Sequence, residues 1–409
     1  MYLLNICKKK NINIKESLFL LMNYLPPPVI GGSGVFMREL CSRISKNKVI
    51  ALTGMRDQDE GIDIDGNMTV YRKKYLWLPK SGFNKIRLIK YIVLFVFNVC
   101  RLNYKNNFSY VVCGEYFPAG IGALVLNFFN GIPYFIVFHG EEIYKVIGWR
   151  KKIISLLISH SKGIVVNSEN TKRLVIDFGI NERIIVCKPC ADHNRFKPAC
   201  SPSSFKKELG LLDKKIILTV SRLIPRKGHK LVISALKKIL KKHPNSIYVI
   251  IGQDLGYEQK IKEHIINCNM MDNVIMTGFV TDEELLKYYQ VCDVFVMVSD
   301  TGPTQDDLEG FGITCLEANA CEKPVICGNT GGMPEAVEEG ITGFIIDPTN
   351  DEIFVKRLDE LLSDPEKCCR MGKEGRKRVI KYFDYEKRSL ELTSQMHEIL
   401  KQSGNVGTK

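Results

Sequence analysis

Short β-branched apolar runs alternate with longer amphipathic segments along most of the chain, a pattern typical of parallel βαβ units. Six runs in the first half are expected to be strands: Leu18–Met22, Val49–Thr53, Tyr110–Cys113, Tyr134–Phe138, Gly163–Asn167 and Ile184–Cys187. After an irregular stretch over residues 188–214, six more follow: Ile216–Val220, Ile247–Ile251, Val274–Thr277, Val294–Val298, Pro324–Cys327 and Gly343–Ile346. Since 409 residues exceed what one hydrophobic core usually holds, the pattern predicts an α/β protein with two doubly wound domains.

We expect the first domain to cover residues 1–198 and the second to cover residues 199–384. Apolar residues recur with helical spacing from Tyr385 onward, so residues 385–409 are expected to form a C-terminal helix with a disordered tail. This helix is expected to pack back towards the first domain. In such sheets ligands lie beyond the carboxyl ends of the strands, so two facing domains predict a site in the cleft between them.

The formal net charge of +13 implies an anionic partner. Nothing in the chain resembles a nucleic-acid-binding module, so a phosphorylated ligand and an anionic membrane surface are the better candidates. No secretory signal is evident, because the basic cluster Lys8–Lys10 follows a short apolar start. The longest apolar run, near Tyr91–Phe97, is too short to span a bilayer. A cytoplasmic protein is expected, with the inner face of the membrane as a further location.

Four residues in the irregular stretch have a spacing that resembles a metal site: Cys187, Cys190, His193 and Cys200. The alternative is an interdomain turn that happens to carry cysteines. The other cysteines of the fourteen sit mostly in apolar runs, where a free thiol behaves as a small hydrophobic side chain.

Two glycine-rich or polar segments follow predicted strands in the first half. Gly31-Gly-Ser-Gly34 precedes a helical pattern, so a ligand could approach its backbone closely, although a plain turn would look the same. His139-Gly-Glu-Glu142 directly follows the strand Tyr134–Phe138, where catalytic groups usually lie in such sheets. The alternative for this segment is a surface turn with solvated carboxylates.

Two further segments follow strands in the second half. Three cations, Arg222, Arg226 and Lys227, precede Gly228 after the strand Ile216–Val220, which favours a diphosphate site over a solvated charge run. Glu309 and Glu317 are separated by seven residues, and the glycines between them lead into a helix. Backbone N–H groups at such a helix start suit an anion, while the second carboxylate can accept hydrogen bonds from a diol.

Taken in order, these segments resemble the retaining glycosyltransferases of family 4, which have the GT-B fold of two Rossmann-like domains. The resemblance covers residues 17–390 and rests on the early Gly-Gly loop, His139-Gly140, Arg222 with Lys227-Gly228, Gly278-Phe-Val280 and the Glu309 to Glu317 block. One departure is Cys187-Lys-Pro-Cys-Ala-Asp192, where the family usually has Pro-Asn-Gly-Val-Asp.

The resemblance implies a role for each matching residue. The donor, a nucleotide diphosphate sugar, would be bound by these residues: Gly32, Arg222, Arg226, Lys227, Val280, Glu309, Gly310, Phe311, Gly312, Ile313 and Glu317. Within that set Glu317 would hold the ribose hydroxyls, Val280 would touch the base, and Glu309 would contact the sugar. His139 and Glu309 would be the catalytic residues, and Glu141 and Glu142 would bind the acceptor. The resemblance implies no cofactor and no essential metal, although Asp306 and Asp307 precede Glu309.

The run from Glu309 onward looks most like mannosyl and glucosyl transferases that act on lipid-linked or surface glycans. A soluble sugar acceptor, as for sucrose or trehalose synthesis, is an alternative, and so is a degenerate protein that binds nucleotide sugars without turnover. Basic, apolar stretches at residues 80–105 and 149–158 predict peripheral contact with an anionic membrane. The alternative is that they are helices packed on the sheet with basic outer faces.

Overall fold

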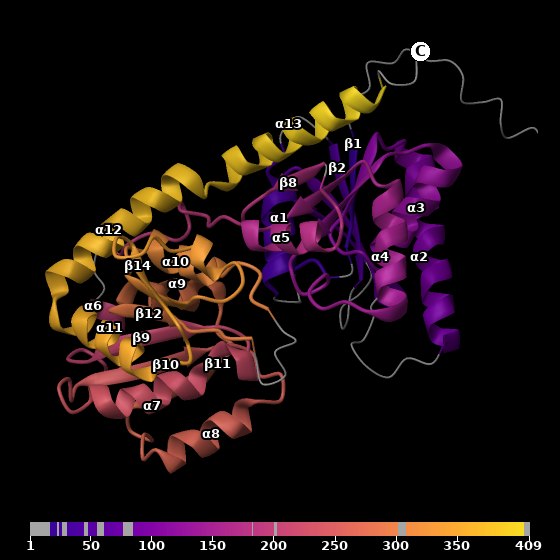
Figure 1. The fold of residues 1–409 in the computed structure, drawn as a ribbon. Coiled ribbons are helices and arrows are strands. Elements are labelled where there is room, and N and C mark those ends of the chain that lie inside the picture. Colours follow the sequence, from indigo (N-terminus) through magenta and orange to yellow (C-terminus); the bar gives the residue numbers. More distant parts are fainter. Residues whose placement is uncertain are drawn as a thin grey trace, which may run out of the picture. The chain divides into compact units, whose positions relative to one another are not determined.

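The computed structural model describes residues 17–22, 24–26, 31–44, 48–54, 61–76, 85–181, 183–199, 203–301 and 308–404 (Figure 1). The chain forms two compact units. The first comprises residues 1–137, 154–163 and 396–409, and the second comprises residues 138–153 and 164–395. The domain boundary near residue 198 and the packing of the C-terminal helix stay predictions.

The first sheet has eight strands in the order β3-β4-β2-β1-β5-β6-β7-β8. Their bounds are β1 Ser17–Leu21, β2 Lys48–Gly54, β3 Gly61–Asp65, β4 Met68–Lys73, β5 Tyr110–Cys113, β6 Tyr134–Phe138, β7 Gly163–Val166 and β8 Ile184–Val186. β1 pairs in parallel with β2 and β5, with Leu18 opposite Val49 and Tyr110. β3 is antiparallel to β4.

The second sheet has six strands in the order β11-β10-β9-β12-β13-β14, and every adjacent pair is parallel. Their bounds are β9 Lys215–Val220, β10 Ser246–Ile251, β11 Val274–Gly278, β12 Val294–Met297, β13 Val325–Gly328 and β14 Gly343–Ile346. The strand order reverses between β9 and β12. Such a reversal leaves a crevice at the carboxyl ends of these two strands, and ligands of doubly wound sheets bind there.

The helices of the first half are α1 Gly32–Ser42, α2 Lys85–Asn106, α3 Ala119–Asn130, α4 Gly148–His160 and α5 Glu169–Asp177. Those that follow are α6 Ser203–Glu208, α7 His229–Ile239, α8 Glu258–Asn267, α9 Asp282–Val291, α10 Ile313–Ala320, α11 Asp351–Ser363, α12 Pro365–Tyr382 and α13 Tyr385–Gly404. The described residues also form three short 3-10 helices: η1 Lys74–Leu76, η2 Pro225–Lys227 and η3 Met333–Glu335. Among the described helices, none combines the length and the apolar character needed to cross a bilayer.

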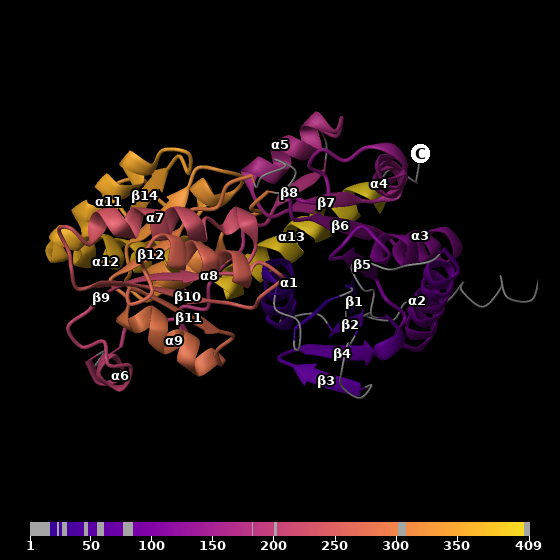
Figure 2. The same cartoon turned by 90° about the horizontal axis from the view of Figure 1, so that it is seen from below.

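Helices cover both faces of the second sheet. α7 and α11 pack against each other over one face, and α9 lies on the other (Figure 2). The core between sheet and helices contains Ile217 of β9, Tyr248 of β10 and Val294 of β12, together with Leu236 of α7 and Leu358 of α11. Burial of such apolar side chains is the main favourable contribution to folding.

The predicted fold class is confirmed, and all twelve predicted strands are present with ends within one residue of those expected. The strands β3 and β4 were missed. β3 was hard to find because its sequence, Gly-Ile-Asp-Ile-Asp, lies half-exposed or exposed at the sheet edge. α6 also lies within residues 188–214, so the expectation of an entirely irregular segment there was wrong.

Candidate active site

The loop after β9 carries two buried cations at the point where the strand order reverses. Arg226 and Lys227 lie in η2 and are only 3% and 6% exposed. Gly228 follows with a φ of 72°, and a Cβ there would lie 2.3 Å from the carbonyl oxygen of Val298. Only glycine fits both the backbone conformation and this contact, so the loop is held against the end of β12.

Glu309 accepts hydrogen bonds from both of these cations, from Nη1 of Arg226 and from Nζ of Lys227. The Ser299 hydroxyl, just beyond β12, lies 3.3 Å from the same carboxylate oxygen. Arg226 also pairs through Nη2 with Oε1 of Glu141 at 3.2 Å. Residues from the ends of β6, β9 and β12 therefore meet around one carboxylate, as expected for a site at the carboxyl edge of parallel strands.

The cations determine the charge state of Glu309. Burial by itself would raise the pKa of the carboxyl, but the charges and hydrogen bonds of Lys227 and Arg226 outweigh burial and lower this pKa to about 2. Burial lowers the pKa of Lys227, and the charges of Arg226 and Arg222 add to that effect against the opposing charge of Glu309. Since the Arg222 charge acts on Lys227, this half-buried side chain lies near the other two predicted cations.

Close backbone contacts fix the loop that carries Glu309. A Cβ at Gly310 would lie 2.5 Å from the carbonyl oxygen of His139, and one at Gly332 would lie 2.1 Å from that of Gly310. The N–H of Gly332 donates to the carbonyl of Glu309 at 2.9 Å. Gly312 then adopts a φ of 93° as the N-cap residue of α10, which begins at Ile313. The glycines are required here because no larger residue permits these approaches.

His139 is buried at the end of β6 and is held through its backbone. Its N–H donates to Glu142 at 2.9 Å, and its carbonyl accepts from Nδ2 of Asn167 at 3.0 Å. Thr171 in turn donates to Oδ1 of Asn167 at 2.8 Å. The Glu142 carboxylate thus holds the turn, and Glu141 pairs with Arg226, while the acceptor roles predicted for both stay predictions.

Glu317 lies on α10, separated from Glu309 by seven residues, and is half-buried. The hydroxyl of Tyr289, on α9, donates to Oε2 of Glu317 at 2.7 Å. Tyr289 is completely buried, and burial followed by the Glu317 charge raises its pKa well above the ordinary value. The phenol therefore stays protonated and acts as a donor that orients the carboxylate.

The remaining predicted site residues are placed as follows. Phe311 is buried, with its ring 6.0 Å from that of Phe383, and Ile313 is the first residue of α10. Val280 is half-buried just after β11. Gly32 is the first residue of α1 and belongs to the first unit.

Asn167, Ser299 and Tyr289 were missed from the sequence. Asn167 directly follows β7 and Ser299 lies just beyond β12, so the strand-end rule that found His139 could have found both. Tyr289 lies inside a helix, 28 residues from its partner, and no local pattern identifies it.

The cysteine cluster does not form a metal site among the residues described. His193 pairs through Nε2 with Oδ2 of Asp384 at 2.8 Å, and Cys187 and Cys190 are buried. Burial raises the pKa of Cys190 to about 12, which keeps it a thiol. No group of three His, Cys, Asp or Glu side chains is arranged to hold a metal within the described ranges. Cys200, Asp306 and Asp307 lie outside the described residues.

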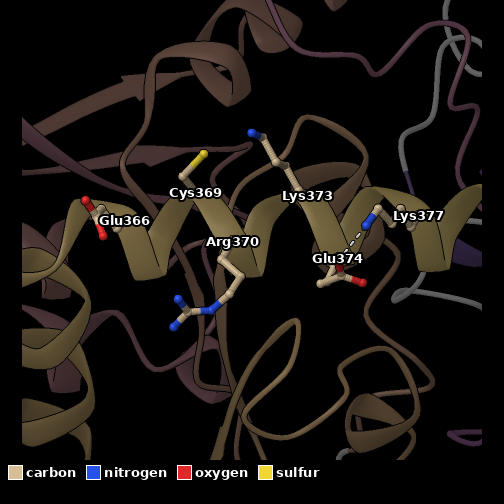
Figure 3. A pocket seen from close by; sticks show the side chains of 6 residues that line it. All are labelled: Glu366, Cys369, Arg370, Lys373, Glu374 and Lys377. Atoms are coloured by element: carbon tan, nitrogen blue, oxygen red, sulfur yellow. Dashed lines mark hydrogen bonds and ion pairs between the residues drawn. The ribbon is translucent and has the colours of Figure 1, made fainter.

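Two surface hollows lie elsewhere in the second unit. One follows the outer face of α12, and Figure 3 shows that one helix supplies all of its side chains: Glu366, Cys369, Arg370, Lys373, Glu374 and Lys377. Lys377 pairs with Glu374 there at 2.7 Å. The other lies near the amino ends of β9 and β13, with Lys215, Cys321 and Pro324 in its wall. Neither contains a predicted site residue.

Two known protein families match separate parts of the chain. The family described as "Glycosyltransferase Family 4" matches residues 30–195, and "Glycosyl transferases group 1" matches residues 202–378. The GDP-mannose-dependent alpha-(1-6)-phosphatidylinositol monomannoside mannosyltransferase of Mycolicibacterium smegmatis is 30% identical over 261 residues, which are 62% of this chain and 67% of that protein.

Solved structures with the same architecture cover nearly the whole chain. The sucrose-phosphate synthase of Thermosynechococcus elongatus superposes with a TM-score of 0.80 at 20% identity, over 95% of this chain and all of that one. Anabaena HepE, determined with UDP and glucose, gives a TM-score of 0.76 at 18% identity, over 94% and 100% of the two chains. At these identities the superpositions show the shared fold alone.

Proposed function

Since the chain belongs to the family 4 glycosyltransferases and has their GT-B fold, we propose that it transfers a hexose from a nucleotide diphosphate sugar to a lipid-linked or growing surface glycan. The hexose is mannose or glucose. Transfer retains the anomeric configuration, as the family resemblance implies, and needs no essential metal. The reaction takes place on the cytoplasmic side of a membrane.

The observation that carries this proposal is the buried cation pair Arg226 and Lys227 where the strand order reverses. In the reaction the bond between C1 of the sugar and the diphosphate oxygen breaks. A bond from C1 to an acceptor oxygen forms, and the proton of the acceptor hydroxyl passes to the departing diphosphate. Negative charge develops on the departing diphosphate, and fixed cations in a water-poor site stabilise that charge most strongly in the transition state.

The matched relative supports a lipid-linked acceptor, because its name gives phosphatidylinositol monomannoside as its substrate. The net charge of +13 supports the same reading, since it suits an anionic surface. The fold of a sucrose-phosphate synthase accommodates a soluble acceptor equally well, so that alternative is distinguished by assay. The buried ion pairs of Glu309 weigh against a degenerate protein, since they keep the charged groups of the site in place.

The test is binding followed by turnover. Titration calorimetry of the purified chain in EDTA, with GDP-mannose, UDP-glucose and ADP-glucose, is expected to show tight binding of one nucleotide sugar. Incubation of that donor with a membrane extract or with free sugar phosphates then identifies the acceptor class. Failure of all three donors to bind would contradict the proposed function, whereas binding without any product would favour the degenerate alternative.

The contact between Tyr289 and Glu317 gives a prediction for the donor site. We expect Tyr289→Phe to weaken binding of the nucleoside diphosphate by about tenfold, since a hydrogen bond to a charged group contributes roughly 1.5–3 kcal/mol and its loss lets the Glu317 carboxylate turn. A 2′,3′-dideoxy nucleotide, which lacks the diol, should bind both proteins equally. The matched control is Tyr288→Phe, because Tyr288 packs on Phe205 instead. An equal loss with both nucleotides would show that Tyr289 acts through general packing.

A further inference from the structure

Helix α2, in the first unit, has two opposite apolar faces. One face is buried and contains Tyr91, Phe95, Val99 and Leu102. The other is a stripe of large apolar side chains that are between 60% and 92% exposed: Ile86, Ile89, Val93, Phe97 and Tyr104. A surface helix of a globular protein normally has one apolar face, which is directed into the core. The second, exposed stripe therefore indicates a surface that contacts a partner.

The exposed stripe is continuous along the helix. Its members are separated by three, four, four and seven residues, which are the spacings that place side chains on one face. From Ile86 to Tyr104 it extends about 27 Å along the axis. The buried residues lie half a turn away, so both faces are used over the whole length of α2.

The charged side chains of α2 that lie beside this stripe are all positive. Lys90, Arg101 and Lys105 are exposed beside it, and the sequence of α2 contains no Asp or Glu. α3 packs beside α2 and carries no charged residue at all (Figure 1). Phe128 and Phe129 at the end of α3 are 80% and 76% exposed and add apolar surface.

We propose that the outward face of α2 lies in the interface of a membrane with anionic lipids. An apolar stripe with cations at its edge matches acyl chains beneath negatively charged headgroups. A second copy of the same face is a poor occupant, because the cations of two copies would face each other with no carboxylate from α2 or α3 between them. This inference stands apart from the donor site and requires no transfer reaction.

Co-sedimentation of the full chain with phosphatidylcholine vesicles, with and without phosphatidylglycerol, tests the proposal. We expect binding only to the anionic vesicles and at least a tenfold weakening in high salt. The double variant Val93→Ser/Phe97→Ser should bind those vesicles at least tenfold more weakly, and Lys90→Ala/Arg101→Ala should lose most of the salt dependence. Nucleotide-sugar binding should be unchanged in both variants, so this test fails or succeeds independently of the proposed activity.

A matched control removes apolar surface elsewhere in the same unit. Ile62 and Ile64 of β3 are 61% and 83% exposed, and Ile62→Ser/Ile64→Ser should bind vesicles as the unmodified chain does. Equal binding by the α2 variant and this control would overturn the proposal. A dimer in sedimentation velocity that Val93→Ser/Phe97→Ser abolishes without lipid would overturn it in favour of a second copy on this face.

Discussion

Replacing Lys227 with methionine is expected to lower kcat/KM for sugar transfer by about 100-fold to 1,000-fold, the usual cost of removing one preorganised group that stabilises developing charge. Methionine preserves most of the side-chain volume, but it removes one of the fixed cations that stabilise the departing diphosphate. The same change removes one of the two cationic partners of the buried Glu309 while Arg226 stays in place, so the free energy of unfolding should fall by about 1.5–3 kcal/mol. Steady-state kinetics and urea denaturation measure the two effects separately.

The double variant Lys227→Met/Glu309→Gln separates catalysis from stability. Because it removes both charges, it should recover much of the lost stability, whereas kcat/KM should stay at or below the value of the single variant. Lys237→Met is the matched control, since Lys237 is exposed on α7 and should affect neither quantity. Recovery of activity together with stability would show that Lys227 serves the fold and not the departing diphosphate.

The strands could be predicted because their residues are buried on both faces of parallel sheets. Tyr134–Phe138 and Val294–Met297 read as unbroken apolar runs for this reason. β3 has the opposite character, because its isoleucines and aspartates alternate at an exposed edge. The one sequence feature that still indicates β3 is the turn that follows it at Asp65-Gly66, where Gly66 has a φ of 56°.

The site was predictable where position along a strand decides the chemistry. His139 directly follows β6, Arg226 and Lys227 lie in the loop after β9, and Glu309 was found through its spacing from Glu317. The sequence could not show that Glu309 pairs with both cations, because that contact joins residues more than 80 positions apart. It also left the glycines unexplained, since the need for Gly310 arises from the His139 carbonyl in three dimensions.

A buried histidine behind the cation loop leads us to expect a loss of stability in mild acid. His229 is 1% exposed and contacts the Ser221 hydroxyl at 3.2 Å and the Tyr248 hydroxyl at 3.2 Å. Burial, and then the charge of Lys227, lower its pKa from 6.5 to about 4. Because the unfolded chain takes up this proton first, stability is unaffected well above pH 6.5 and falls as the pH drops towards 4. The loss approaches about 3 kcal/mol below pH 4.

This window differs from that of Glu309, whose pKa of about 2 lies below the ordinary 4.5, so its contribution is lost only as the pH falls through 4.5 towards 2. Between pH 7.5 and pH 5, the unmodified chain should therefore lose about 2 kcal/mol more unfolding free energy than His229→Gln, as measured by urea denaturation. His160→Gln, at an exposed position, should retain the full pH dependence. If His229→Gln retains it too, then His229 becomes protonated inside the folded chain near its ordinary pKa, and the buried cation loop must tolerate one more positive charge.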